Sequence, residues 1–224
     1  RAANDACRLL DVESDAGVAE ACAAAYCDVA RIDAARALAD VRLVAMDMDS
    51  TLITIECVDE IAAARGIKAE VAAITARTMR GEIDFAESLQ QRVALLAGTP
   101  ASALADVYAR RLRLSPGAER LLQALHAQRT QTLLLSGGFT FFTDRLRERL
   151  GFTASFANTL EIVDGHLTGR LVGPILDARA KAALVTQWAQ DARRDGGIVV
   201  TIGDGANDIP MLAAADVSVA WHAK

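Results

Sequence analysis

The sequence predicts an α/β fold: a parallel sheet with helices on both faces, and a small α-helical cap domain inserted after the first strand. Four short apolar runs flanked by helical patterns indicate buried strands of such a sheet. Polar turns follow three of the four runs, and a long helical stretch separates the first run from the second. The runs are VRLVAMD (41–47), QTLLLS (131–136), GIVVTIGD (197–204) and DVSVAW (216–221).

Composition excludes several classes of function. The chain has 224 residues, enough for one large domain or a core domain with a smaller companion. With a net charge of −5 and no long basic run, nucleic acid and anionic membrane surfaces are not expected as partners. We find no apolar run long enough to span a bilayer and no signal peptide. The four cysteines form no CxxC pair, which predicts a reduced, cytoplasmic protein.

Residues 1–40 are rich in alanine and contain no strand-like run. Their pattern predicts one or two helices, either a linker or a partial domain, with a structural role. Because the chain begins with Arg1 and stops directly after an apparent strand, we expect it to be part of a longer protein.

The core domain is predicted to comprise residues 41–54 and 115–224, and the cap residues 55–114. The insertion holds amphipathic helical runs and is several times longer than the dozen or so residues that a crossover helix needs. Within it, Thr99-Pro100 predicts an N-cap and first helical position, and Ser115-Pro116 predicts the next helix start. Asp164-Gly165 predicts a two-residue hairpin turn.

Paired carboxylates follow two of the predicted strands. Asp47 and Asp49 lie two residues apart in DMDST, and Asp204 and Asp208 lie in GDGAND. The carboxyl ends of parallel strands meet at one crevice, where each pair of like charges about 4 Å apart costs on the order of 4 kcal/mol. A hard divalent cation relieves this repulsion, and Mg²⁺ fits a few carboxylates plus water best.

An EF-hand loop starting at Asp47 is excluded, since it requires Gly at position six and Glu at position twelve, where this chain has Leu52 and Val58. Zinc or a histidine base is also not expected. The three histidines, His126, His166 and His222, all lie away from the acid-rich motifs.

A second candidate element is SGGFT, from Ser136 to Thr140, between a strand and a helix. From these residues alone, an ordinary helix cap and an anion site formed by hydroxyl and backbone N–H groups are equally good interpretations. Lys181 stands at the front of another predicted helix. On its own it is read as a solvated lysine, but a phosphate among carboxylates would need such a second cation.

The order of these motifs resembles the haloacid dehalogenase-like phosphohydrolases and, among them, the phosphoserine phosphatases. The resemblance runs from about Leu43 to Lys224. It rests on DMDSTLITIECVDEIA, TARTMRGEIDFAESLQQRV, LSGGFTFF, ANTLEIVDGHLTG and IGDGANDIPML. It implies a Rossmann-like core and a cytoplasmic, Mg²⁺-dependent enzyme of serine biosynthesis that hydrolyses O-phosphoserine through an aspartyl phosphate. A homodimer is left open.

The resemblance also implies a role for each matching residue. Asp47 matches the nucleophile and Asp49 the acid that protonates the leaving oxygen and then activates water. The implied Mg²⁺ ligands are Asp47, the backbone carbonyl of Asp49, and Asp204, with Asp208 supporting them. Ser136, Gly137, Lys181 and Asn207 match the phosphate-binding residues, Glu56 and Arg92 the partners of the substrate ammonium and carboxylate, and Met79 and Phe85 the apolar residues that close over the substrate.

The sequence allows three interpretations of the site. The substrate is phosphoserine, or it is another small phosphomonoester, including one whose phosphoryl group passes to an alcohol. Alternatively the same pocket binds a phosphorylated ligand without catalysis, although binding alone needs no Asp47/Asp49 pair. Without the family resemblance, Glu56 and Arg92 would be read as surface charges on a cap helix.

Overall fold

The computed structural model describes residues 17–27, 37–194 and 196–222. The chain divides into two compact units, residues 1–38 and residues 39–224. In the first unit the described residues form helix α1 (Val18–Ala24). The rest of the predicted helical segment over residues 1–40 lies largely outside the described residues.

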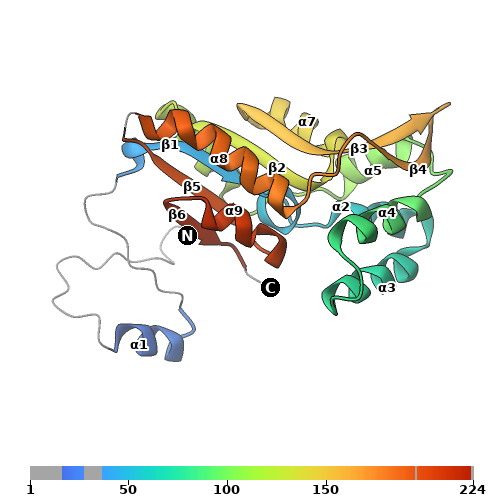
Figure 1. The fold of residues 1–224 in the computed structure, drawn as a ribbon, viewed down its shortest axis with the longest axis horizontal. Coiled ribbons are helices and arrows are strands. Elements are labelled where there is room, and N and C mark those ends of the chain that lie inside the picture. The colour runs from blue at the N-terminus through green and yellow to red at the C-terminus, as the bar shows by residue number, and fades with distance from the viewer. Residues whose placement is uncertain (1–16, 28–36, 195, 223–224) are drawn as a thin grey trace. The chain divides into compact units, whose positions relative to one another are not determined.

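The second unit is built on a six-stranded sheet with the order β4-β3-β2-β1-β5-β6 (Figure 1). Its strands are β1 (Val41–Met46), β2 (Gln131–Phe139), β3 (Ala154–Val163), β4 (His166–Val172), β5 (Ile198–Gly203) and β6 (Val217–Ala220). All neighbouring strands run parallel except the β3–β4 hairpin at one edge. The predicted Rossmann-like fold is therefore confirmed, with one antiparallel strand added to it.

Helices cover both faces of the sheet because alternate residues of the central strands point to opposite sides. Leu43 and Ala45 of β1 pack with α8 (Ala178–Arg194) and α9 (Ile209–Ala213). Val44 and Met46, on the other face, belong to a core that includes α6 (Ala118–Ala127) and α7 (Thr140–Leu150). Burial on both sides explains why β1 is an almost continuous apolar run.

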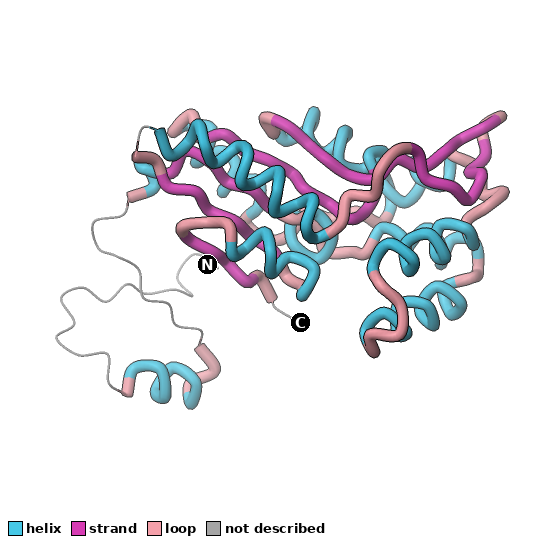
Figure 2. The backbone as a smooth tube through the Cα atoms, viewed as in Figure 1, coloured by secondary structure: helices cyan, strands magenta, loops and turns pink. Residues whose placement is uncertain are grey.

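Five α-helices lie between β1 and β2 in the chain, and the first four of them form the helical insertion. These four are α2 (Cys57–Arg65), α3 (Lys68–Met79), α4 (Phe85–Leu95) and α5 (Ser102–Arg110). The two segments that connect them to the sheet run side by side, since Ile53 bridges Leu114 and the Ser115 N–H donates to the Leu52 carbonyl at 2.9 Å. Figure 2 shows these helices gathered beside the β3–β4 hairpin.

Local turn chemistry was predicted correctly at the hairpin and wrongly at two helix starts. Asp164 and Gly165 both have positive φ, 48° and 74°, as a two-residue hairpin turn requires. Helix α5, however, begins at Ser102, because Thr99 and Pro100 pair with the hairpin instead: the Leu167 N–H donates to the Thr99 carbonyl at 2.8 Å. Likewise α6 begins at Ala118 rather than directly after Ser115.

Among the described residues, no helix combines the length and the apolar character that crossing a membrane would require.

Candidate active site

Three buried carboxylates meet at the carboxyl ends of β1 and β5. Asp47 directly follows β1 and Asp204 directly follows β5, and these two strands are neighbours in the sheet. Asp208 comes from the short turn that precedes α9. Carboxylate oxygens of the three residues all lie within 4.8 Å of one another. The crevice predicted from strand order thus brings together the two acidic motifs DMDST and GDGAND.

A buried lysine lies against this cluster. Lys181 Nζ is 2.5 Å from Asp47 Oδ1 and 2.9 Å from Asp208 Oδ1. Burial alone would lower the pKa of Lys181, but the attraction of Asp47 and Asp208 raises it, so the ammonium form is retained. Lys181 is therefore an interior cation and not the solvated lysine that its position in the sequence suggests on its own.

Burial also acts on Asp47. It raises the pKa of the Asp47 carboxyl to about 7; the charge of Lys181 opposes this rise, and the charge of Asp208 adds to it. The protonation state of Asp47 is thus governed by how much positive charge the cluster holds.

Asp208 is fixed by donors on both of its oxygens. Its Oδ2 accepts from the backbone N–H of Asp204 at 3.1 Å and of Gly205 at 3.3 Å, while Oδ1 accepts from Asn207 Nδ2 at 3.3 Å as well as from Lys181. A Cβ at Gly203 would lie 2.6 Å from Asp208 Oδ2, so this close approach requires glycine. Asp208 therefore shapes the turn that presents Asp204.

Asp49 has a different environment from Asp47, although only Met48 separates them. Its Oδ2 accepts from the Cys57 backbone N–H at 3.3 Å, and its buried Oδ1 has no hydrogen-bond partner among the described residues. Burial and then the neighbouring charges of Glu56 and Asp47 raise the pKa of Asp49 well above its usual range. A raised pKa favours the protonated form, which is the form that a general acid needs.

The SGG segment forms a loop beside Asp49. Leu135 pairs with Phe156 and Phe139 pairs with Asn158, so three residues of β2 stand opposite one residue of β3. Ser136 Oγ accepts from the Gly138 N–H at 2.9 Å inside this loop. A Cβ at Gly138 would lie 3.2 Å from Asp49 Oδ2, which shows how closely the loop approaches that acid.

The structure brings three of the four predicted cap residues toward the site. Phe85 opens α4, and its ring tip would lie 2.9 Å from a Cβ at Gly137. Glu56 accepts from Ser50 Oγ at 2.7 Å. Burial lowers the pKa of Arg92, and the charges of Asp59, Glu56 and Asp49 act against this shift, which places Arg92 within their field. Met79 is 81% exposed at the end of α3, and its predicted role stays a prediction.

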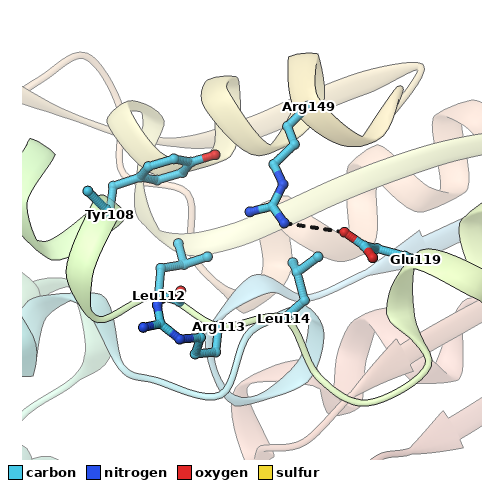
Figure 3. Close-up of a pocket in the computed structure, with 7 residues that line it drawn as sticks. Tyr108, Leu112, Arg113, Leu114, Glu119 and Arg149 are labelled. Atoms are coloured by element: carbon cyan, nitrogen blue, oxygen red, sulfur yellow. Dashed lines mark hydrogen bonds and ion pairs between the residues drawn. The ribbon is translucent and has the colours of Figure 1, made fainter.

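A pocket of about 390 Å³ lies elsewhere, where α5, the returning connection and helices α6 and α7 meet. Figure 3 shows Arg149 extending from α7 toward Glu119, with 3.2 Å between Nη2 and Oε1. None of the residues lining this pocket belongs to the carboxylate cluster. The chemistry therefore has to be sought in the buried cluster and not in this cavity.

Comparison with known proteins agrees with this geometry. Residues 44–213 match the model of the haloacid dehalogenase-like hydrolase family, a range that contains every acidic residue of the cluster. The chain belongs to the haloacid dehalogenase-like hydrolases.

The most similar proteins found include several phosphoserine phosphatases. This hydrolase is 53% identical to a phosphoserine phosphatase of Polaromonas sp. over 84% of this chain and 81% of that one. It is 51% identical to the Streptomyces coelicolor phosphoserine phosphatase over 82% of this chain but only 44% of that longer protein. The resemblance to phosphoserine phosphatases predicted from the sequence is thereby confirmed.

Two solved structures resemble the hydrolase closely. A probable phosphoserine phosphatase from Vibrio cholerae in unliganded form has a TM-score of 0.83 at 43% identity, covering 96% of this chain and 67% of that one. A substrate-bound phosphoserine phosphatase complex has a TM-score of 0.73 at 35% identity, covering 82% and 87%.

The oxygen ligands that this hydrolase offers suit a metal ion, and members of its family generally use one. Asp47, Asp204 and Asp208 offer carboxylate oxygens that are buried and close together. An all-oxygen, anionic set of this kind suits a hard divalent cation and not a soft one.

Two residues with structural contacts to the site were not singled out from the sequence. Thr51 Oγ1 donates to Asp204 Oδ1 at 3.2 Å, and its place within DMDST was a signal that could have found it. Asn158, on β3, contacts the SGG loop. Asn158 lies within ANTLEIVDGHLTG, one of the segments that carry the family resemblance, but it was given no role, because its relevance depends on the register between β2 and β3.

Proposed function

We propose that this hydrolase converts O-phospho-L-serine and water into L-serine and phosphate through an aspartyl phosphate on Asp47, with Mg²⁺ as its cofactor. The observation that carries the proposal is the contrast between two neighbouring acids. Asp47 forms an ion pair with Lys181, whereas one oxygen of the buried Asp49 has no hydrogen-bond partner in the part of the chain that the structure describes, and the pKa of Asp49 is raised. This is the arrangement that a nucleophile and a general acid require.

In the first step a carboxylate oxygen of Asp47 attacks the phosphorus atom. The bond from phosphorus to the serine oxygen breaks, and that oxygen takes the proton of Asp49. In the second step the Asp49 carboxylate removes a proton from water, whose oxygen attacks phosphorus. The bond to Asp47 then breaks and phosphate leaves, so both residues return to their starting states.

Several side chains would hold the phosphoryl group during both steps. Lys181 provides positive charge, and the loop at Ser136 and Gly137 provides a hydroxyl and backbone N–H groups. Asn207 lies beside Asp208, to which it donates, and completes the proposed set. Preorganised donors of this kind stabilise charge that develops in the transition state without reorganising first.

Mg²⁺ would be held by Asp47, the backbone carbonyl of Asp49, and Asp204, with Asp208 supporting that arrangement. When bound, it supplies positive charge that neutralises the phosphoryl oxygens and the nearby carboxylates. The buried, all-oxygen donor set supports this assignment.

The cap would select an amino-acid ester. Glu56 would pair with the substrate ammonium and Arg92 with its carboxylate, for which the planar guanidinium is suited. Phe85, which already lies against the SGG loop, and Met79 would close over the substrate. The names of the relatives support phosphoserine as that substrate.

The reaction would then be the last step of serine biosynthesis. We place it in the cytoplasm, where the thiols of Cys22, Cys27 and Cys57, which are free in the structure, would stay reduced.

The proposal is tested by assaying phosphate release from O-phospho-L-serine with Mg²⁺, with a chelator, and in the Asp47→Asn variant. We expect Asp47→Asn to lower kcat by about three orders of magnitude or more, because the amide cannot form the phosphoenzyme. Asp191→Asn, at an exposed carboxylate on α8, should leave kcat unchanged.

Full turnover by Asp47→Asn would contradict the proposed nucleophile. A panel of phosphorylated amino acids and sugars assayed in parallel separates phosphoserine from other phosphomonoesters. Capture of a beryllofluoride adduct on Asp47 separates catalysis from simple binding of a phosphorylated ligand.

A further inference from the structure

The loop at Ser136–Gly138 interrupts the pairing between β2 and β3. Its three residues face a single residue of β3, so the regular ladder of backbone hydrogen bonds cannot continue through it. One carbonyl of the loop is nevertheless satisfied. Asn158 Nδ2, from the residue where pairing resumes, donates to the Gly137 carbonyl at 2.9 Å. A side-chain amide thus replaces the missing ladder contact.

The same amide holds a second segment with its other end. Asn158 Oδ1 accepts from the Leu176 N–H at 2.7 Å, and the side chain belongs to a residue only 2% exposed. Leu176 precedes Asp177, which receives the first hydrogen bonds of α8 from the N–H groups of Ala180 and Lys181. The start of α8, and with it the stem of Lys181, is therefore tied to the SGG loop through one carboxamide.

We propose that Asn158 is a positioning residue for phosphate binding: it sets the separation between the Gly137 backbone and the Lys181 ammonium. The inference rests on the proposed function, in which Gly137 and Lys181 hold the phosphoryl group from two different elements. Asn158 donates to the Gly137 carbonyl, which is an acceptor, and not to the Gly137 N–H that would donate to phosphate. It therefore acts through the loop and α8.

Asparagine suits this role because it offers a donor and an acceptor from one short, planar group. A leucine of similar size would leave the Gly137 carbonyl and the Leu176 N–H without these partners, and both segments would be free to shift. Buried groups that lose their partners destabilise a structure locally. If Asn158 serves only to stabilise the sheet, variants that lose the same amount of stability should lose the same amount of phosphate affinity, wherever the substitution lies.

The test measures the Kd of inorganic orthophosphate by calorimetric titration of the whole chain in Mg²⁺, alongside kcat/KM for O-phospho-L-serine. We expect Asn158→Leu to raise this Kd about tenfold and to lower kcat/KM by a similar factor. Thr153→Val is the matched control. Thr153 Oγ1 accepts from the Thr132 N–H at 3.0 Å at the opposite ends of the same two strands, so this variant should lose melting temperature but keep its Kd within twofold.

Melting curves establish that each variant is folded. If Asn158→Leu fails to fold, Asn158→Ser decides, because its short hydroxyl cannot reach both segments and the same rise in Kd is expected. A folded Asn158 variant that binds orthophosphate within twofold of the wild type overturns the inference alone. A wild-type chain that neither binds orthophosphate nor hydrolyses phosphoserine overturns the proposed function, and the inference with it.

Discussion

At the scale of single residues, environment distinguishes two identical side chains. Asp47 and Asp49 differ by two positions, yet of these two only Asp47 pairs with Lys181, and one oxygen of Asp49 has no hydrogen-bond donor among the residues that the structure describes. The left-handed backbone of Ser50, with φ of 57°, turns the chain immediately after Asp49. The surroundings of each side chain, and not residue type, therefore distinguish the candidate nucleophile from the candidate acid.

The raised pKa of Asp49 predicts a pH-dependent stability in metal-free protein. As pH rises above the unfolded pKa, the unfolded chain loses the Asp49 proton while the folded chain keeps it. Stability associated with this group is thus fully present below the unfolded pKa and is lost as pH rises through the folded one. Asp49→Asn does not titrate, so we expect its melting temperature relative to the wild type to increase between about pH 5 and about pH 8.

Thermal unfolding in a chelator measures this difference. Asp191→Asn, whose carboxylate is exposed in an ion pair with Arg194, serves as the control with no such trend. A melting-temperature difference between Asp49→Asn and wild type that stays constant over this range would show that Asp49 ionises freely in the folded state.

Much of the site was predictable from residue order, because the carboxyl ends of neighbouring parallel strands lie at the same edge of the sheet. Asp47, Asp204 and Asp208 meet as the sequence predicts. The residues alone did not decide whether Lys181 is solvated or buried, because this depends on how α8 packs against the sheet. The role of Asn158 was missed, although it lies in a segment that resembles the family, because its contacts depend on the register shift between β2 and β3.

At the scale of elements, the N-terminal end of α4 meets the loop that follows the central part of β2. A methyl group added at Gly137 would lie 2.9 Å from the Phe85 ring tip. We therefore expect Gly137→Ala to raise KM for phosphoserine severalfold by displacing this ring, and to have a smaller effect in a Phe85→Ala background. Kinetics of the two single variants and the double variant measure this coupling.

Gly138→Ala provides the control for this double-mutant cycle. Its added methyl would meet Ser136, Met48 and Asp49, none of which belongs to α4. Phe85→Ala should therefore not relieve the effect of Gly138→Ala. Equal coupling of Phe85 to both glycines would mean that the ring influences the loop in some way other than direct contact.

Element types were predicted well and element boundaries less so. The four apolar runs are strands β1, β2, β5 and β6 of the sheet, but β6, at the sheet edge, is largely exposed and not buried as its apolar run predicted. The start of α5 was displaced to Ser102 because backbone pairing with the β3–β4 hairpin competes with capping at Thr99. Such long-range pairing cannot be inferred from the capping residues themselves.

At the scale of the whole molecule, the carboxylate cluster should make stability depend on divalent metal. Binding at one hundred times Kd stabilises a fold by about 2.7 kcal/mol, which corresponds to roughly 5–10 °C for a chain of this length. We expect Mg²⁺ to raise the melting temperature by this amount and a chelator to reverse the effect. Calorimetric scans with and without Mg²⁺ provide the measurement.

Asp204→Asn should lose most of this response, while Asp191→Asn, at an exposed position, should keep it. An undiminished Mg²⁺ response in Asp204→Asn would show that the ion stabilises the protein at some other place.

The ion pair between Lys181 and Asp47 joins positions 134 residues apart. Asp208 lies still further along the chain. A fragment that ends before Asp208 therefore lacks part of the proposed site. During synthesis, a ribosome-bound chain would thus remain inert until nearly all of this sequence has emerged and folded. Appearance of turnover would accordingly report the last stage of maturation, long after the first strands have collapsed together.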